Sequence, residues 1–300
     1  MTDDRIPMPF HPGELRAQAL AGVETFAAPI RNRMPDQHRT FFPLLPFLCV
    51  AVADDEGWPL ATLVQGPPGF ASSPDPARLD VAALPAADDP ARPYLAAGTT
   101  VGMLGIDLGT RRRNRLNGVV AALGDGGFAV DVVQSFGNCP RYIHVRALVP
   151  VARTPGPVSA FGADLPQRAR AMLAASTTLF VASSSGADAP GATRGLDISH
   201  RGGPAGFARL DGNVLTVPDY AGNRYFNTLG NFVSEPRAAI VLADVASGDV
   251  LQLQGIVDVD WTAAQPDRVP PVERVWRFTI VHGWLRPGAF GLAEAAGDAR

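Results

Sequence analysis

The sequence predicts a mainly β protein with short helices, built from two tandem copies of one small six-stranded antiparallel barrel. Glycine and proline together make up about a fifth of the 300 residues, which favours turns and short elements over long helices. The apolar segments have the length of strands. The third observation is an internal repeat, which divides most of the chain into two halves.

The repeat becomes visible when the sequence is shifted against itself by 137 residues. Residues 66–71 (GPPGFA) then align with residues 203–208 (GPAGFA), and Leu116 aligns with Leu253. One register holds without a gap over residues 66–120, which indicates duplication of a domain. We therefore expect both halves to have the same fold.

The repeat and a proline-rich segment near residues 150–157 set the predicted domain boundaries. We expect an N-terminal arm with a helix over residues 1–24, a first barrel over residues 25–155 and a second barrel over residues 156–300. Two such barrels in one chain would form a pseudo-dimer, and further homodimerisation of the whole chain stays open.

Each copy is expected to begin with a helix, over residues 35–42 in the first and residues 166–173 in the second. The strands that follow are either continuous apolar runs or, as in the segment LQLQGIVDV, alternate apolar and polar residues. The clearest strands are predicted over residues 47–52, 128–133, 178–182, 251–259 and 278–281. A leading helix and about six closely spaced strands per copy favour a small antiparallel barrel.

The chain contains no lysine, so all 26 basic residues are arginine. This excludes mechanisms that need a Schiff-base lysine or a phosphate-loop lysine. Any anion that the protein binds must be held by arginine, backbone amides or hydroxyl groups.

The remaining composition narrows the partners and the compartment. A net charge of -3 and a pI near 5.9 give no basic surface for nucleic acid. No apolar stretch is long enough to span a membrane, and the N-terminal residues do not fit a secretory signal. We therefore expect a cytoplasmic protein. No spacing among the five histidines forms a metal site.

The two copies differ where chemistry would be expected. Residues 197–203 (DISHRGG) align with residues 60–66 (LATLVQG), so a hydroxyl is kept while a histidine and an arginine become apolar. Residues 218–224 (PDYAGNR) of the second copy precede a predicted helix and suit a phosphate, because helix N-terminal amides and a guanidinium both attract anions. The alternative is a solvated turn with surface arginines.

The first copy has the opposite asymmetry. Residues 111–115 (RRRNR) precede a predicted strand, whereas the aligned residues 248–252 (GDVLQ) are nearly neutral. Such a run is also typical of a solvated strand edge that blocks edge pairing. The other interpretation is that the basic cluster of one copy and the anion cradle of the other complete one site across their interface.

Three segments resemble a known family: residues 102–118, residues 134–143 (QSFGNCPRYI) and residues 199–231. They are similar to the pyridoxamine 5'-phosphate oxidase-like, FMN-binding split-barrel superfamily, and most similar to its two-barrel branch. The resemblance covers most of residues 35–290. It implies paired six-stranded split β-barrels with FMN in the groove between them.

The resemblance also implies FMN-binding roles for individual residues. They are Ser199, His200, Arg201 and Gly202 along the flavin and its phosphate; Asp219, Asn223, Arg224 and Thr228 at the phosphate turn; Arg113, Arg115 and Asn117 on the strand of the opposing barrel; and Asn138 and Arg141 near the barrel mouth. His200 is the one candidate for a catalytic role, either tuning the flavin or relaying a proton. A plain hydrogen-bonded strand residue is the other interpretation of His200.

The expected function is that of an FMN-dependent oxidoreductase, either an oxidase or an NAD(P)H-dependent reductase, acting on a small-molecule substrate that the sequence does not identify. Two alternatives stay open. The first is a non-catalytic protein that stores or senses FMN. The second is a haem-binding split barrel with His200 or His282 as the iron ligand.

Overall fold

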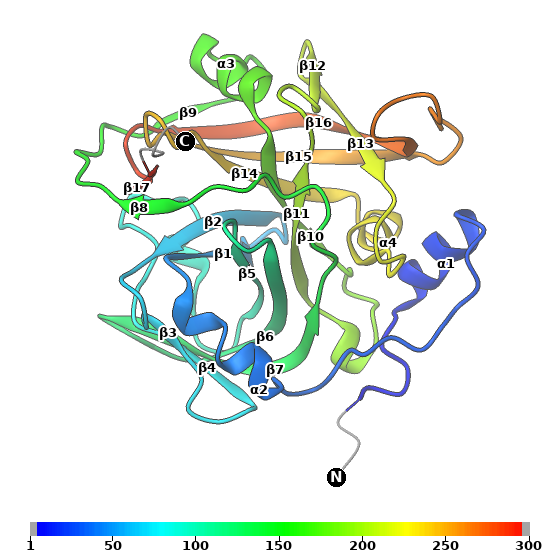
Figure 1. Ribbon diagram of the computed structural model, residues 1–300, viewed down its shortest axis with the longest axis horizontal. Helices are drawn as coiled ribbons and strands as arrows, with labels where there is room; N and C mark the ends of the chain where they lie inside the picture. Colours follow the sequence, from blue (N-terminus) through cyan, green and yellow to red (C-terminus); the bar gives the residue numbers. More distant parts are fainter. Residues whose placement is uncertain (1–4, 296–300) are drawn as a thin grey trace.

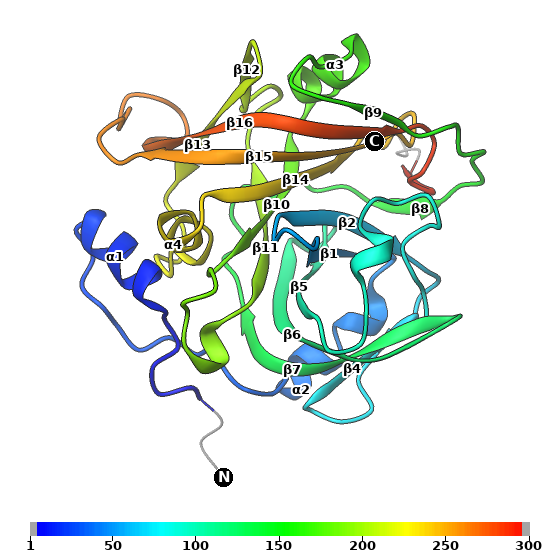
Figure 2. The same ribbon diagram turned by 180° about the vertical axis from the view of Figure 1, so that it is seen from behind.

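The computed structural model describes residues 5–295 and consists mainly of two curved antiparallel sheets (Figures 1 and 2). The first half contributes β1 (Phe47–Ala53), β2 (Pro59–Gln65), β3 (Ala71–Ser72), β4 (Arg78–Val81), β5 (Thr100–Asp107), β6 (Arg112–Gly124) and β7 (Gly127–Gly137). The second half contributes β10 (Thr178–Ser184), β11 (Leu196–Gly202), β12 (Arg209–Asp211), β13 (Val214–Tyr220), β14 (Arg237–Ala243), β15 (Val250–Asp260) and β16 (Val272–Arg286). All five strands predicted above are present.

The two sheets have the same strand order. The order is β2-β1-β5-β6-β7-β4-β3 in the first sheet and β11-β10-β14-β15-β16-β13-β12 in the second. The registers also agree with the shift of 137 residues: Arg115 pairs with Leu104, and Gln252 pairs with Val241. Residues of the two halves can therefore be compared position by position.

The predicted fold is confirmed only in part: the protein is mainly β with short helices, but its two sheets do not have six strands each. The first sheet has seven strands and the second has eight, because β9 (Ser159–Phe161) adds to β16, and both are open paths in the described part of the chain. The extra strands follow tight turns at Gly69 (φ 90°) and Gly206 (φ 70°), a backbone conformation that favours glycine. These turns reverse the chain so that β3 and β12 extend the sheets.

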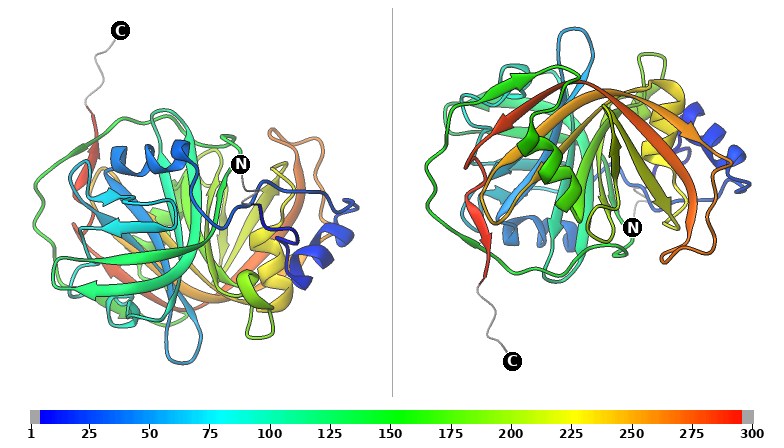
Figure 3. Two further views of the ribbon diagram at one scale, coloured as in Figure 1. Left: turned by 90° about the horizontal axis from the view of Figure 1, so that it is seen from below. Right: turned by 90° about the horizontal axis from the view of Figure 1, so that it is seen from above.

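The helices are short. They are α1 (Pro12–Leu20), α2 (Asp36–Arg39), α3 (Gln167–Ala175) and α4 (Asn227–Ser234), with single 3-10 turns at η1 (Phe42–Leu44), η2 (Arg92–Tyr94) and η3 (Gly191–Thr193). Helix α1 lies beside α4 of the second half (Figures 1 and 3). Two further strands, β8 (Leu148–Pro150) and β17 (Leu292–Glu294), pair with each other and join the connecting segment to the C-terminal region. No helix among the described residues is long and apolar enough to cross a membrane.

Each half has its own apolar core, and a third core lies between the halves. Leu48 and Val50 of β1 face the first core, whereas Phe47 and Cys49 face the shared one, where Phe180 of β10 also packs. A strand buried on both faces must be apolar at every position, which explains the continuous run over residues 47–52. Both cysteines are free.

The halves approach each other closely where β5 contacts β11. A Cβ added to Gly102 would lie 2.8 Å from the backbone of Leu196 and Asp197. We expect Gly102→Val to separate the sheets and lower the free energy of unfolding by about 1–3 kcal/mol, a usual cost of overpacking. Denaturant titration measures this change. The matched control is Gly124→Ala, whose added Cβ meets nothing within 4 Å; an equal effect of both substitutions would contradict the expectation.

Candidate functional site

Two neighbouring clefts lie at the boundary between the halves. We define the arginine cleft by Arg115, Arg201, Arg224 and Arg274, with an empty volume of about 440 Å³. The histidine cleft, of about 400 Å³, is lined by Arg113, Cys139, Arg141, Tyr142 and His200. The clefts share Arg201, Tyr220 and Gly222. Together six arginines line them, against the carboxylates of Asp219 and Glu273, so their lining carries an excess of positive charge.

Strand β11 is the central element of both clefts. Ser199 is fully buried, and its Oγ lies 2.8 Å from Oγ1 of Thr228, so the pair fastens helix α4 to the strand. Gly202 must be small, because an added Cβ would lie 2.1 Å from the carbonyl oxygen of Tyr142. The sequence pattern SHRG therefore combines a helix anchor, two cleft-lining groups and a close backbone approach.

A buried carboxylate holds two of the arginines. Arg201 and Arg274 each donate to Asp219 over 3.1 Å, and Asp219 is only 6% exposed. Burial raises the pKa of Asp219, and the two guanidinium groups oppose this shift. The structure thus places Asp219 as the support of two arginines. Arg274 was not among the site residues predicted from the sequence. It lies opposite Asp219 in the pairing of β13 with β16.

The first half supplies the half-buried Arg113 and the buried Arg115 to the same place. Arg113 Nη1 lies 3.1 Å from Nδ1 of His200, and Arg113 Nε donates to the carbonyl oxygen of Cys139 over 2.8 Å. Arg115 forms a 2.8 Å ion pair with Asp197. Burial, together with the neighbouring charges of Arg115 and Arg201, lowers the pKa of Arg113 to about 9. An anion in the cleft would relieve this repulsion.

The hydrogen bonds of His200 define its tautomer. A guanidinium can only donate, so Nδ1 of His200 must accept from Arg113, and the proton of the neutral ring lies on Nε2. Burial lowers the pKa of His200 well below its usual value, and Arg113 and Arg201 lower it further. His200 is therefore a neutral ring that offers an N–H donor, and Nε2 has no partner among the described residues.

Buried polar atoms without a partner occur at several predicted site residues, three of which line the clefts. Among the described residues eleven such atoms occur, and five of them belong to predicted site residues. Three are donors: Nε of Arg115, Nε of Arg201 and Nε2 of His200. Buried polar groups are normally hydrogen-bonded, so unsatisfied donors in a positively charged cleft fit an acceptor-rich ligand such as a phosphate ester.

The turn before α4 presents a further cation. Arg224 is exposed, has a φ of 62° and forms no hydrogen bond or ion pair with the rest of the described chain. Asn223 Oδ1 accepts from the backbone N–H of Tyr225 over 3.2 Å and so shapes the turn. No side chain caps the first turn of α4, which leaves its amides available to an anion.

Four predicted residues lie at the edge of the clefts or outside them, and one of these is the buried Ser199 described above. Arg141 is exposed at the histidine cleft. Asn138 does not appear in the described lining of either cleft, although its Oδ1 is buried without a partner. Asn117 lies in a separate pocket and donates to Gln134 over 3.2 Å.

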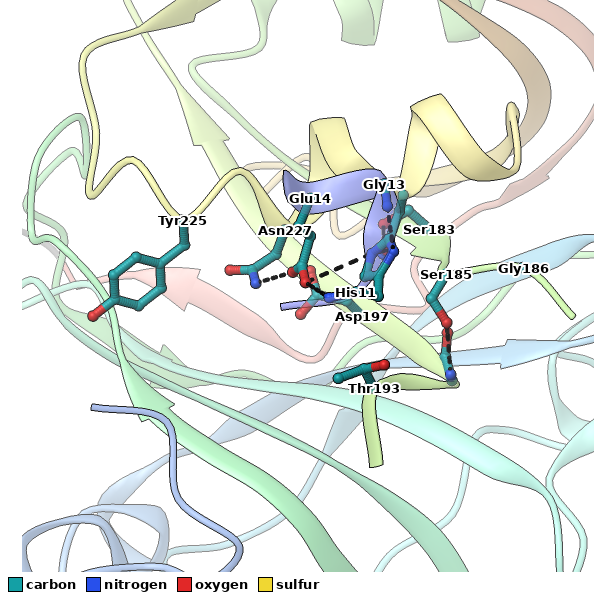
Figure 4. Close-up of polar contacts among 12 residues, drawn as sticks. His11, Gly13, Glu14, Ser183, Ser185, Gly186, Thr193, Asp197, Tyr225 and Asn227 are labelled. Atoms are coloured by element: carbon teal, nitrogen blue, oxygen red, sulfur yellow. Dashed lines mark hydrogen bonds and ion pairs between the residues drawn. The ribbon is translucent and has the colours of Figure 1, made fainter. Parts of the chain in front are cut away.

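A buried polar cluster that was not predicted from the sequence lies behind the arginine cleft, where α1 meets α4 (Figure 4). Glu14 accepts from the side chain of Asn227 and from the backbone N–H of His11, and Asn227 in turn accepts from Arg115 over 3.3 Å. His11 Nε2 lies 2.8 Å from Oδ1 of Asn231. Burial raises the pKa of Glu14 to about 7. The sequence signal was the spacing of His11 and Glu14 around Pro12, which forms a capping box at the start of α1.

No family model and no curated protein matches the chain. Among solved structures, a HupZ variant from Group A Streptococcus has a TM-score of 0.31 and 12% identity over 40% of this chain and 98% of that protein. A FAD-binding protein from Mesorhizobium loti has a TM-score of 0.29 and 10% identity over 43% of this chain and 97% of that protein.

A candidate pyridoxamine 5'-phosphate oxidase from Lactobacillus delbrueckii has a TM-score of 0.28 and 15% identity over 35% of this chain and 94% of that protein. At TM-scores this far below 0.5, none of these likenesses establishes a shared family or a shared function.

Proposed function

We propose that this protein binds FMN at the boundary between its halves, with the phosphate in the arginine cleft, and that it is an FMN-dependent oxidoreductase. The observation that carries the proposal is the excess of arginines over carboxylates in a cleft that also contains unsatisfied buried donors. Phosphate is an acceptor with a double negative charge, which matches both properties.

The residues of the chain would share the work of binding. Arg201, Arg224 and the first amides of α4 would hold the phosphate, while Asp219 and Arg274 keep Arg201 oriented. His200 would donate its Nε2 proton toward the cofactor, positioned by Arg113 from the other half. FMN itself would supply two-electron redox chemistry when bound.

The substrate would be a small molecule, and the reaction either that of an oxidase or that of an NAD(P)H-dependent reductase. A protein that only stores or senses FMN would have the same cradle, so turnover is the property that separates the two functions. Haem binding through His200 is less suited to the site, because the lone pair of Nδ1 already accepts from Arg113 and Nε2 carries a proton.

The visible spectrum of the purified protein, before and after addition of FMN, is the direct test. We expect flavin absorption bands and quenched flavin fluorescence. A colourless protein that leaves added FMN unchanged would contradict the proposal, and a Soret band would favour haem. Anaerobic stopped-flow mixing with NADH and with NADPH then shows whether bound flavin is reduced, as expected for a reductase but not for a storage protein.

A further inference from the structure

The shared strand order means that the arginine cleft has a counterpart on the other side of the interface. Ser199 of β11 pairs with Val181 of β10, and in the same place of the first sheet Thr62 of β2 pairs with Val50 of β1. Gln252 in β15 takes the position of Arg115 in β6, because each pairs with the equivalent residue of the neighbouring strand. Arg115 lines the arginine cleft and Ser199 is buried behind it, so the counterpart of this region is built around Thr62 and Gln252.

A carboxylate occupies the centre of this counterpart. Asp89 lies between β4 and β5, just as the phosphate turn and α4 lie between β13 and β14, and it is only 2% exposed. Its Oδ2 accepts from Thr62 Oγ1 over 2.5 Å and from Arg286 Nη1 over 2.7 Å. Its Oδ1 accepts from Gln252 Nε2 over 3.1 Å and from the backbone N–H of Ala91 over 2.9 Å.

This arrangement has the chemistry of an oxyanion site. A hydroxyl, an amide, a guanidinium and a backbone N–H from both halves converge on two carboxylate oxygens. Arg286 is 5% exposed and Gln252 is 1% exposed, and each has one further buried side-chain atom without a partner. Asp88 also accepts from Arg286 over 2.8 Å. In the second half the hydroxyl of Ser199 meets the hydroxyl of Thr228 instead of a carboxylate, while Arg115, at the position of Gln252, pairs with Asp197 over 2.8 Å.

We propose that the first half contains a second oxyanion site, pseudo-equivalent to the arginine cleft, and that Asp89 is its built-in anion. By occupying this second site, the carboxylate of Asp89 closes it to external phosphate groups. The chain then offers one external anion site although its fold contains two. That the external ligand is one FMN per chain rests on the proposed function; the oxyanion site around Asp89 does not.

Removal of the carboxylate tests the site directly. Asp89→Ala should lower the melting temperature, because Arg286 stays buried without its main partner. Formate matches the deleted group, so it should bind in the vacated space and raise the melting temperature of Asp89→Ala with increasing concentration. The control is Asp89→Ala combined with Arg286→Met, which removes the cation as well. It should show only the small response of the wild type, and sodium chloride should not replace formate in any variant.

An equal response of Asp89→Ala and the double variant to formate would overturn the proposal. If Asp89→Ala is recovered only as insoluble protein, refolding with and without formate makes the same comparison: recovery in formate alone supports the site, and failure in both overturns it. In a separate titration, we expect one FMN per wild-type chain. Two FMN per chain would overturn the closure by Asp89, whereas no FMN binding together with formate rescue would contradict only the proposed function.

Discussion

Replacing both Arg201 and Arg224 by alanine is expected to weaken FMN binding by about 2–5 kcal/mol, which is roughly 30-fold to several thousand-fold in the dissociation constant. Arg201 is a half-buried arginine whose buried Nε has no partner among the described residues, and Arg224 is an exposed arginine at the rim of the same cleft. Quenching of flavin fluorescence measures the affinity. Riboflavin lacks the phosphate, so its affinity should change much less.

Two matched variants sharpen this result. Lysine in place of both arginines keeps the charge but loses the planar fork, so an intermediate loss is expected. Alanine at Arg16 and Arg209, two exposed arginines outside the clefts, should leave FMN binding unchanged. The assignment of the phosphate site would be wrong if wild-type protein bound riboflavin as tightly as FMN, or if the alanine variant kept its FMN affinity.

Glu14→Gln is expected to change the pH dependence of stability by up to about 3 kcal/mol between pH 4.5 and pH 8. The pKa of Glu14 rises from 4.5 to about 7 in the folded protein because the carboxyl is buried. The folded state therefore binds the proton more tightly than the unfolded state. The contribution of Glu14 to stability is fully present below its unfolded pKa and is lost as the pH rises through 7.

Buried histidines act in the opposite direction. Burial lowers the pKa of His11, and it lowers that of His38 to about 4, so their contribution is lost as the pH falls below 6.5. The wild-type profile contains both effects, and the difference between wild type and Glu14→Gln isolates the carboxyl. Denaturant titrations at pH 5 and pH 8 should show the variant gaining stability relative to wild type at the higher pH. The same difference at both pH values would contradict the role of Glu14.

Much of the fold could be predicted from sequence, because the strands carry local signals. The continuous run over residues 47–52 is a direct consequence of burial on two faces. The alternation over residues 251–259 predicts the strand, but Gln252 and Gln254 on its polar face are buried as well. The number of strands could not be predicted, because β3 and β12 have two and three residues and owe their place to turns.

Some residues of the candidate site could likewise be predicted from the sequence, and others could not. The asymmetry between residues 197–203 and residues 60–66 is visible in the sequence, and so is the arginine run of the first half. Arg274 and Asp89 carry no local signal of their own, because each acts through partners that are distant in the chain. Glu14 has the local signal of a capping box, but its contact with Asn227 is equally distant in the chain. Asn117 follows the arginines in β6 but lines a different pocket.

The sequence by itself determined that arginine must do all the cationic work, since the chain has no lysine, and that the two halves share one scaffold. Only the tertiary structure decided which arginines are neutralised and which stay available. Arg286 meets Asp89 and is closed off, whereas Arg224 meets no carboxylate. The physical reason is that charge pairing acts over a few ångströms in space, and a residue's neighbours in space are set by the packing of the two sheets.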